Sequence, residues 1–376
     1  MQRFIIIPDS FKGTISSIEI CEIIKQKAQL IFPDCDVVTL PVADGGEGTV
    51  DCFLQAMPGE KVSCQVTGPW FEQVDSFYGI FGKTAVIEMA AAAGLPMVED
   101  RKDPSKTTTY GVGELMKHAM EHGATEIVLG MGGSCTTDGG CGCAAALGAK
   151  FYREDGSEFV PVGENLDQIA RVDLQEVEKL CKGVSITAMC DVENPMYGSR
   201  GAAYVFGPQK GAGPRMVEML DQNLKALAKI MEEQLGLAGL PQQEGAGAAG
   251  AFGAGAVAFL EAKLNSGIET VLDHVHFDEH LKTADAVFTG EGRFDSQSLD
   301  GKVISGVARR TKAAEIPLYV IAGDLARDIP DAYSRGVTAM FSINRNAIPF
   351  EEAKKHSKED LAFMAENIFR LMRGGK

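Results

Sequence analysis

A glycine-rich segment, residues 130–142 (GMGGSCTTDGGCG), is the stretch of this sequence best suited to bind a ligand. Six of its thirteen residues are glycine, so the backbone can adopt positive φ and approach a bound molecule closely. An apolar run precedes it and an alanine-rich run follows it, which predicts a strand, a loop and a helix whose N-terminus favours an anion. A tight turn without a ligand is the alternative. The candidate phosphate-binding residues are Gly132, Gly133, Ser134, Thr136 and Asp138.

A second glycine-containing loop, residues 44–48 (DGGEG), carries carboxylates where a phosphate-only site would need cations. Magnesium that accompanies a nucleotide is usually held through one or two carboxylates and the phosphates themselves. We therefore expect Asp44 to be a magnesium ligand. The alternative is a simple turn in which Glu47 favours the start of the following helix through its charge.

The segment 190–195 (CDVENP) follows a predicted strand and presents Asp191 and Asn194 together. A carboxylate beside an amide can orient a hydroxyl group or accept its proton during phosphoryl transfer. Asp191 is accordingly the candidate base, and Asn194 a candidate substrate-binding residue. Further along, Lys210 offers a donor to an acidic substrate, although a lysine taken singly is more often a surface residue.

Two loops near opposite ends of the chain combine acidic and basic side chains. Residues 8–14 (PDSFKGT) follow the first predicted strand, at the sheet edge where ligands of open α/β folds bind. Residues 290–295 (GEGRFD) place an arginine between two carboxylates, which suits bidentate capture of a carboxylate or phosphate, with ion pairing inside the loop as the alternative. The candidates are Lys12 and Arg293 as catalytic cations, Asp9, Ser10, Glu291 and Lys302 as substrate-binding or phosphate-binding residues, and Asp295 as a second magnesium ligand.

The elements that position these loops follow two rhythms. Strand and helix alternate over residues 4–57 and again from residue 284, which predicts a doubly wound parallel sheet. Between them, residues 61–89 alternate in hydrophobicity with turn signals, as antiparallel hairpins do. We expect an α/β protein of two domains. One parallel domain comprises residues 1–60 and 284–376, and a mixed α/β domain, residues 61–283, is inserted into it and carries the glycine-rich loop, with the reaction in the cleft between the domains.

The composition restricts the partners. The formal net charge of −16 argues against nucleic acid or an anionic membrane as a partner. Nine cysteines without a disulfide or zinc spacing, and no apolar stretch of signal-peptide length at the start, favour a reducing cytoplasmic location. The tract GAGAAG at residues 245–250 matches a dinucleotide-binding fingerprint but does not follow a predicted strand, so a dinucleotide-dependent oxidoreductase is only an alternative.

Taken in order, PDSFKGT, PVADGGEGT, the GGS and DGG segments, CDVENP, FGPQKGA, the GAGAAG tract and TGEGRFDSQS resemble the type-1 glycerate kinase family. The resemblance extends from Phe4 to about Asp324. It implies a flavodoxin-like domain interrupted by a second α/β domain, and phosphorylation of D-glycerate with ATP and magnesium.

The sequence therefore predicts an ATP-dependent kinase of D-glycerate, with 2-phosphoglycerate as the expected product and 3-phosphoglycerate as the alternative. ATP and Mg²⁺ are the expected cofactors, and a homo-oligomer is compatible with the sequence. Besides the oxidoreductase, a non-catalytic sugar-acid sensor is a further alternative, although no helix-turn-helix with a basic face is visible.

Overall fold

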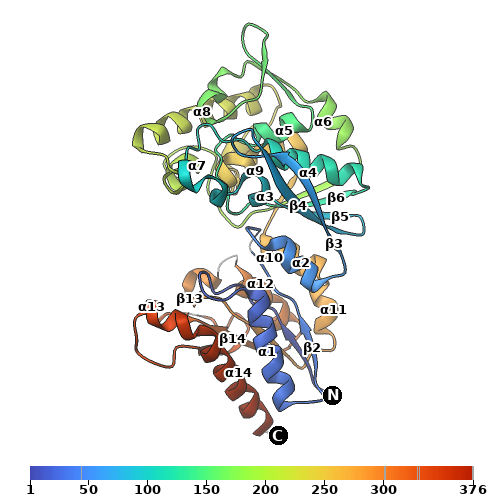
Figure 1. The fold of residues 1–376 in the computed structure, drawn as a ribbon, viewed down its shortest axis with the longest axis vertical. Helices are drawn as coiled ribbons and strands as arrows, with labels where there is room; N and C mark the ends of the chain where they lie inside the picture. The colour runs from blue at the N-terminus through green and yellow to red at the C-terminus, as the bar shows by residue number, and fades with distance from the viewer. Residues whose placement is uncertain (44, 300–301, 328, 330, 375–376) are drawn as a thin grey trace. The chain divides into compact units, whose positions relative to one another are not determined.

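The structure, a computed structural model, describes residues 1–376 except 44, 300, 301, 328, 330, 375 and 376 (Figure 1). It divides into two compact units, and each is described by itself. The first unit comprises Met1–Asp44, Asp51–Pro58 and Ser266–Lys376, so both ends of the chain contribute to it. The second comprises Gly45–Val50 and Gly59–Asn265. No helix in the described part of the chain is both long and apolar enough to cross a membrane.

The first unit is built on a five-stranded sheet in the order β16-β14-β12-β1-β2. All four neighbouring pairs are parallel. Numbered along the unit, this order is 2-1-3-4-5, the flavodoxin-like arrangement that the family resemblance implied. The predicted fold class is confirmed. The strands are β1 (Arg3–Ile6), β2 (Asp36–Thr39), β12 (Ala286–Thr289), β14 (Leu318–Ala322) and β16 (Val337–Ser342).

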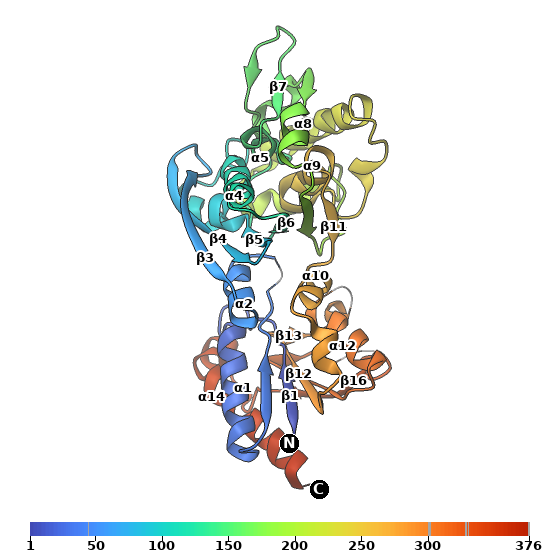
Figure 2. The same cartoon turned by 90° about the vertical axis from the view of Figure 1, so that its right-hand side faces the viewer.

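Helices cover both faces of this sheet (Figure 2). On one face, α1 (Ser17–Ile31) and α14 (Ser357–Gly374) pack over Phe4, Phe288 and Phe369, which contact one another edge-on or tilted. Helix α1 begins at Ser17, directly after Ser16, which forms a reciprocal capping box with Glu19. The other face carries α10 (Gly267–His274) and α12 (Val303–Ala313).

The sequence placed the start of the second parallel segment at residue 284, whereas the first unit already includes residues from Ser266 onward. Ion pairs explain the difference. Arg310 of α12 binds Glu269, Asp273 and Asp278, which lie in α10 and α11 (Phe277–Leu281). The two short helices are thereby attached to α12, a contact that has no signature in their own sequence.

The second unit contains a six-stranded mixed sheet in the order β11-β10-β6-β5-β4-β3. Strands β3 and β4 form the predicted antiparallel hairpin, β4 also pairs antiparallel with β5, and β5, β6, β10 and β11 are parallel. The strands are β3 (Glu60–Thr67), β4 (Gln73–Phe81), β5 (Thr84–Glu88), β6 (Glu126–Gly130), β10 (Ser185–Met189) and β11 (Lys263–Asn265).

Shorter elements complete the chain. A small antiparallel sheet holds β7 (Lys150–Tyr152), β8 (Glu158–Phe159) and β9 (Arg171–Asp173), and β13 (Arg293–Phe294) pairs with β15 (Asp324–Leu325). The remaining α-helices are α2 (Thr49–Ala56), α3 (Ala90–Ala93), α4 (Tyr110–Glu121), α5 (Cys141–Ala146), α6 (Gln175–Leu180), α7 (Ala202–Phe206), α8 (Pro214–Glu233), α9 (Ala248–Leu260) and α13 (Phe350–Ala353).

Candidate active site

The predicted loops of the second unit gather at one edge of its sheet. Strands β5, β6 and β10 are parallel neighbours, so their carboxyl ends, Glu88, Gly130 and Met189, lie at the same edge. The glycine-rich loop follows β6 and the 190–195 segment follows β10. Glu88 reaches the 45–50 segment by accepting hydrogen bonds from the backbone N–H groups of Gly48 and Val50.

Close backbone contact fixes the first part of the glycine-rich loop. The N–H of Gly132 donates to the carbonyl of Gly45 at 3.0 Å, and a Cβ on Gly130 would lie 2.4 Å from that same carbonyl oxygen. Only glycine fits at such an approach. Gly133 is exposed and has φ of +72°, so its backbone is presented to solvent in a conformation that glycine favours.

The second part of the loop is buried. Ser134 is 7% exposed, and Thr136 is completely buried. The side chain beneath them is Lys210, which donates from Nζ to Ser134 Oγ at 2.7 Å and to the carbonyl of Thr136 at 2.6 Å. A lysine taken singly is more often at the surface, but Lys210 is 2% exposed, and burial lowers its pKa to about 8.

Asp138 is also completely buried, and its partners all belong to the protein. Its carboxylate accepts hydrogen bonds from the backbone N–H and hydroxyl of Thr109 and from the N–H groups of Gly140 and Gly142. Burial raises the pKa of Asp138, against the effect of these donors. These hydrogen bonds join the starts of α4 and α5, so in this structure Asp138 stabilises the conformation of the loop.

The GAGAAG tract packs against the same loop. A Cβ on Gly250 would lie 2.1 Å from the carbonyl of Thr136, and one on Gly247 would lie 2.2 Å from the carbonyl of Pro195. Ala249 and Ala251 have φ of +53° and +69°, a conformation that costs about 1–2 kcal/mol per residue outside glycine. These glycines therefore serve close packing between two loops, which removes the reason to read the tract as a dinucleotide site.

The segment after β10 is more open. Asp191 is exposed and Asn194 is half-buried. The side chain of Asn194 donates to the carbonyl of Arg200 at 2.8 Å, and its backbone carbonyl accepts from Gly247. Asn194 thus shapes the segment, while the carboxylate of Asp191 is presented at the sheet edge.

A separate group of candidates lies at the carboxyl edge of the first unit's sheet. Strands β1 and β12 are adjacent there, at the point where the strand order reverses and open α/β sheets bind ligands. The N–H of Asp9 donates to the carbonyl of Gly290 at 2.8 Å, and Ser10 donates its N–H to the Asp9 carboxylate at 2.6 Å. The loops that carry Lys12 and Arg293 are therefore brought side by side.

The cations of this edge are exposed. Lys12, Arg293 and Lys302 all project into solvent, and Arg293 lies 3.9 Å from the carboxylate of Asp324. An exposed ion pair of this length contributes little to folding. Arg293 is thus only weakly restrained by Asp324.

Glu291 is the unusual carboxylate of this edge. Its Oε1 is buried and has no hydrogen-bond partner among the described residues, and burial raises the pKa of Glu291 to about 7. Ser298 and Lys302 lower the pKa, whereas the charges of Asp9 and Asp295 raise it further. The structure therefore brings Asp9, Glu291, Asp295 and Lys302 into one electrostatic neighbourhood.

Of the two predicted magnesium ligands only Asp295 can be examined, because Asp44 lies outside the described residues. Asp295 is half-buried and near Glu291. The described residues contain no group of three or more His, Cys, Asp or Glu side chains that could hold a metal. A nucleotide-borne Mg²⁺ needs only one or two carboxylates, so oxygen ligands of this kind fit it.

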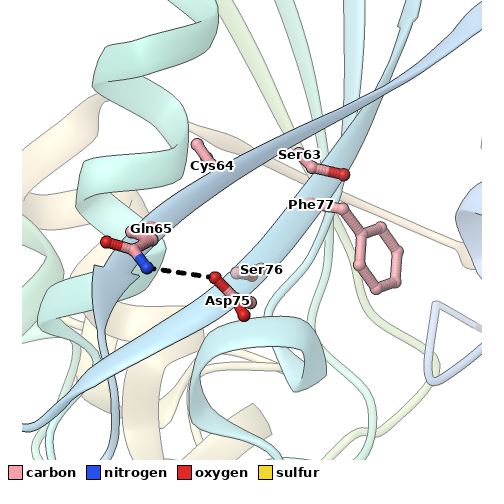
Figure 3. Close-up of a pocket in the computed structure, with 6 residues that line it drawn as sticks. All are labelled: Ser63, Cys64, Gln65, Asp75, Ser76 and Phe77. Atoms are coloured by element: carbon pink, nitrogen blue, oxygen red, sulfur yellow. Dashed lines mark hydrogen bonds between the residues drawn. The ribbon is translucent and has the colours of Figure 1, made fainter.

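A pocket of about 500 Å³ lies elsewhere, on the β3–β4 hairpin. Figure 3 shows its lining residues, with Gln65 donating to Asp75 across the two strands at 3.3 Å. None of the predicted site residues lines this pocket. It is a surface hollow of the hairpin, apart from the loops described above.

Comparison with known proteins identifies this arrangement. The family model described as the glycerate kinase family matches residues 4–373. This chain belongs to the glycerate kinase family. It is 44% identical to a glycerate kinase of Bacillus cereus, with 97% of each chain covered, and 42% identical to a glycerate 2-kinase of Escherichia coli, also with 97% of each covered.

The fold agrees with a solved member. A crystal structure of a protein provisionally named glycerate kinase 2, from Salmonella typhimurium LT2, superimposes with a TM-score of 0.88 at 41% identity, covering 100% of this chain and 99% of the other. The prediction of an ATP-dependent kinase enzyme is therefore confirmed at the level of the family.

Proposed function

We propose that this kinase transfers the γ-phosphoryl group of ATP to D-glycerate and that the product is 2-phosphoglycerate. The observation that carries the proposal is the loop 130–142, a glycine-built backbone cradle at the edge of parallel strands with a buried cation beneath it. Membership of the glycerate kinase family and the name of the Escherichia coli relative, a glycerate 2-kinase, support the acceptor and the product.

The proposed roles follow from the chemistry of each edge. Phosphoryl transfer asks a protein mainly for positioning and charge stabilisation. The backbone of Gly132 and Gly133 and the hydroxyl of Ser134 bind nucleotide phosphate. Lys12, Arg293 and Lys302, being exposed cations, bind the carboxylate of the acid or the transferring phosphoryl group. Asp191 accepts the proton of the reacting hydroxyl.

Mg²⁺ belongs to the proposal as the usual companion of the nucleotide. Asp295, and Asp44 outside the described residues, would hold it. The ion would neutralise charge on the phosphate oxygens. The residues of this chain then orient the acid and take up its proton. Nine free cysteines fit a cytoplasmic location.

The experiment is a coupled assay of ADP release with ATP, Mg²⁺ and D-glycerate, and the product is identified by phosphorus NMR. L-Glycerate, tartronate and a reaction without acceptor are the controls. We expect turnover with D-glycerate alone and the resonance of 2-phosphoglycerate. A 3-phosphoglycerate signal would correct the product, and no turnover above the blank would overturn the function.

The role of Asp191 is tested separately. Asp191→Asn keeps the size of the side chain and removes its proton acceptor, so we expect kcat to fall at least a hundredfold with KM for ATP little changed. Nearly full turnover in this variant would remove Asp191 as the base.

A further inference from the structure

Lys210 is a buried cation whose donors are not all used. It ends a 3₁₀ turn (Pro208–Lys210), and its Nζ is bound by Ser134 Oγ and the Thr136 carbonyl. An ammonium group carries three N–H donors. Within the described part of the chain, the third donor has no recorded acceptor. A buried ammonium with an unused donor is costly unless something else binds it.

The two loop residues above Lys210 have unused donors as well. An ammonium has no lone pair, so Ser134 Oγ must accept from Lys210, and its own hydrogen must point elsewhere. No acceptor for that hydrogen is recorded among the described residues. Thr136 Oγ1 is buried and likewise has no partner in the described structure. Two hydroxyls of this loop and the ammonium group that binds it thus leave three donors unsatisfied within the described structure.

The charge of Lys210 is also uncompensated. No carboxylate forms an ion pair with it in the described part of the chain. Asp138 and Cys135 are the groups whose charges would favour its protonated form. Yet Asp138 is occupied by Thr109, Gly140 and Gly142, and burial raises the pKa of Cys135 to about 12, so its thiol is neutral near pH 7. What completes this arrangement is an anion that accepts hydrogen bonds.

We propose that Lys210 is the cation of the nucleotide-phosphate site, where it turns the Ser134 hydroxyl outward and supplies positive charge to the phosphate chain of ATP. This rests on the proposed function, because it takes the bound anion to be the nucleotide. The carboxylate of the acid substrate offers the same chemistry, and the experiment separates the two.

Four variants test the proposal. Lys210→Met keeps the length of the side chain and removes the charge, Lys210→Arg keeps the charge with another geometry, and Ser134→Ala removes the outward hydroxyl. Lys229→Met is the matched control, because Lys229 is an exposed lysine of the same unit, 3.8 Å from Glu233. The measurements are the Kd for ADP by calorimetry without acid, and KM for ATP and for D-glycerate.

We expect Lys210→Met to raise the Kd for ADP and the KM for ATP at least tenfold while KM for D-glycerate changes less than twofold. Ser134→Ala should change both nucleotide constants threefold or more in the same direction. Lys229→Met should leave all three constants unchanged. A rise confined to KM for D-glycerate would assign the anion to the acid and overturn the proposal.

A pH series distinguishes a charge in the site from a structural lysine. Phosphate oxygens of ATP are fully ionised well above pH ~6, so the nucleotide does not titrate between pH 7.5 and 9.5. Lys210 loses its proton near pH 8 in the free protein. The Kd for ADP of the wild type should therefore rise several-fold over this range, whereas the Kd of Lys210→Met should not change with pH. Asp138 and Cys135 are present in both proteins, so they cannot account for a difference between the two pH profiles.

The outcomes are separable. A folded Lys210→Met with the wild-type Kd, or with the wild-type pH profile, overturns the proposal. If Lys210→Met does not fold, the wild-type pH series and Lys210→Arg decide. Arginine keeps its charge over this range, so a pH-independent Kd for ADP in the wild type, or a Kd in Lys210→Arg that follows the wild-type pH profile, overturns the proposal. If the wild type binds ADP through Lys210 but does not phosphorylate D-glycerate, the proposed function fails and the nucleotide site stands.

Discussion

The two loop edges of the molecule are built in opposite ways. In the second unit, Ser134 to Gly140 are all buried, and the loop is defined by backbone contacts and a buried carboxylate. In the first unit, the candidate cations Lys12, Arg293 and Lys302 are exposed, and one long ion pair restrains Arg293. A backbone cradle cannot adapt without unfolding, whereas long charged side chains can rearrange around a small acid.

This comparison has a general consequence. Substitutions at the second unit's edge should reduce stability and activity together, because the same contacts support both. Substitutions at the first unit's edge should change activity and leave the free energy of unfolding nearly constant. The following predictions can break or sharpen that contrast, beginning with the largest effect.

Gly250→Ala should have the largest effect. The new Cβ would lie 2.1 Å from the Thr136 carbonyl, and φ is +71°, so the loop must shift or the residue must leave the left-handed region. We expect a loss of roughly 3 kcal/mol or more in the free energy of unfolding, and at least a hundredfold loss of activity. Gly213→Ala is the control, since nothing lies within 4 Å of its Cβ position. Chemical denaturation measures the stability and the kinase assay measures the activity. A stable and active Gly250→Ala would show that close packing at Gly250 is not needed to support the loop 130–142.

Asp138→Asn should follow closely. The amide NH₂ would face N–H and O–H donors where the carboxylate now accepts, so buried donors would lose their acceptor. We expect about 2–4 kcal/mol of destabilisation and a matching fall in kcat/KM for ATP. Asp155→Asn, in an exposed turn, should change stability by less than about 0.5 kcal/mol. Equal stability of the two variants would show that Asp138 does not organise the loop.

Arg293→Met should separate activity from stability. Removing this exposed guanidinium should raise KM for D-glycerate roughly tenfold to a hundredfold, the loss expected for a charged hydrogen bond to an anion. The unfolding midpoint should stay at the wild-type value, as it should in the control Arg370→Met. An unchanged KM with a lowered midpoint would reverse the contrast between the units.

Glu291→Gln should show the smallest effect, and only as the pH rises above about 4.5. The folded-state pKa of Glu291 is raised to about 7 from 4.5, so its contribution to stability is present below pH 4.5 and is lost as pH rises through 7. Glutamine stays neutral, so at pH 8 the free energy of unfolding of the variant should exceed that of the wild type by on the order of 1–2 kcal/mol. At pH 4.5 the two free energies should be nearly equal.

Urea titrations at both pH values, without nucleotide or metal, check this, with the exposed Glu22→Gln as control. A pH-independent difference would mean that the Glu291 carboxyl titrates near its ordinary value.

The parallel sheet of the first unit could be predicted because its signals are local. Short apolar runs predict two of its strands, at Phe4–Ile7 and Leu318–Ala322. The capping box predicts the start of helix α1. The chain's return to the same sheet after some two hundred residues is predicted by the second stretch of alternating strands and helices. Strand β11 and helices α10 and α11 were not anticipated, because they are short and depend on partners distant in sequence.

The sequence predicts which loops carry the candidate site better than it predicts the role of each residue in them. Glycine-rich composition located residues 130–142, but nothing local distinguishes Asp138, which bonds within the protein, from Ser134, which has a free donor. Lys210 had no periodic or spacing signal to show that it is buried, because its burial comes from contacts 74 and 76 residues away. The identity of the glycines at 245–250 as packing residues likewise requires the third dimension.

The discontinuous first unit has a consequence for synthesis on the ribosome. Strand β1 lies between β2 and β12, and β12 begins only at Ala286. All residues of the second unit, which ends at Asn265, are therefore made before β12, the second partner of β1, emerges. We expect the second unit to fold first, while β1 waits with an unpaired edge, since domains generally fold as units during synthesis. Nascent chains stalled near residue 300 should accordingly combine a protease-resistant second unit with an N-terminal segment open to cleavage or chaperone binding.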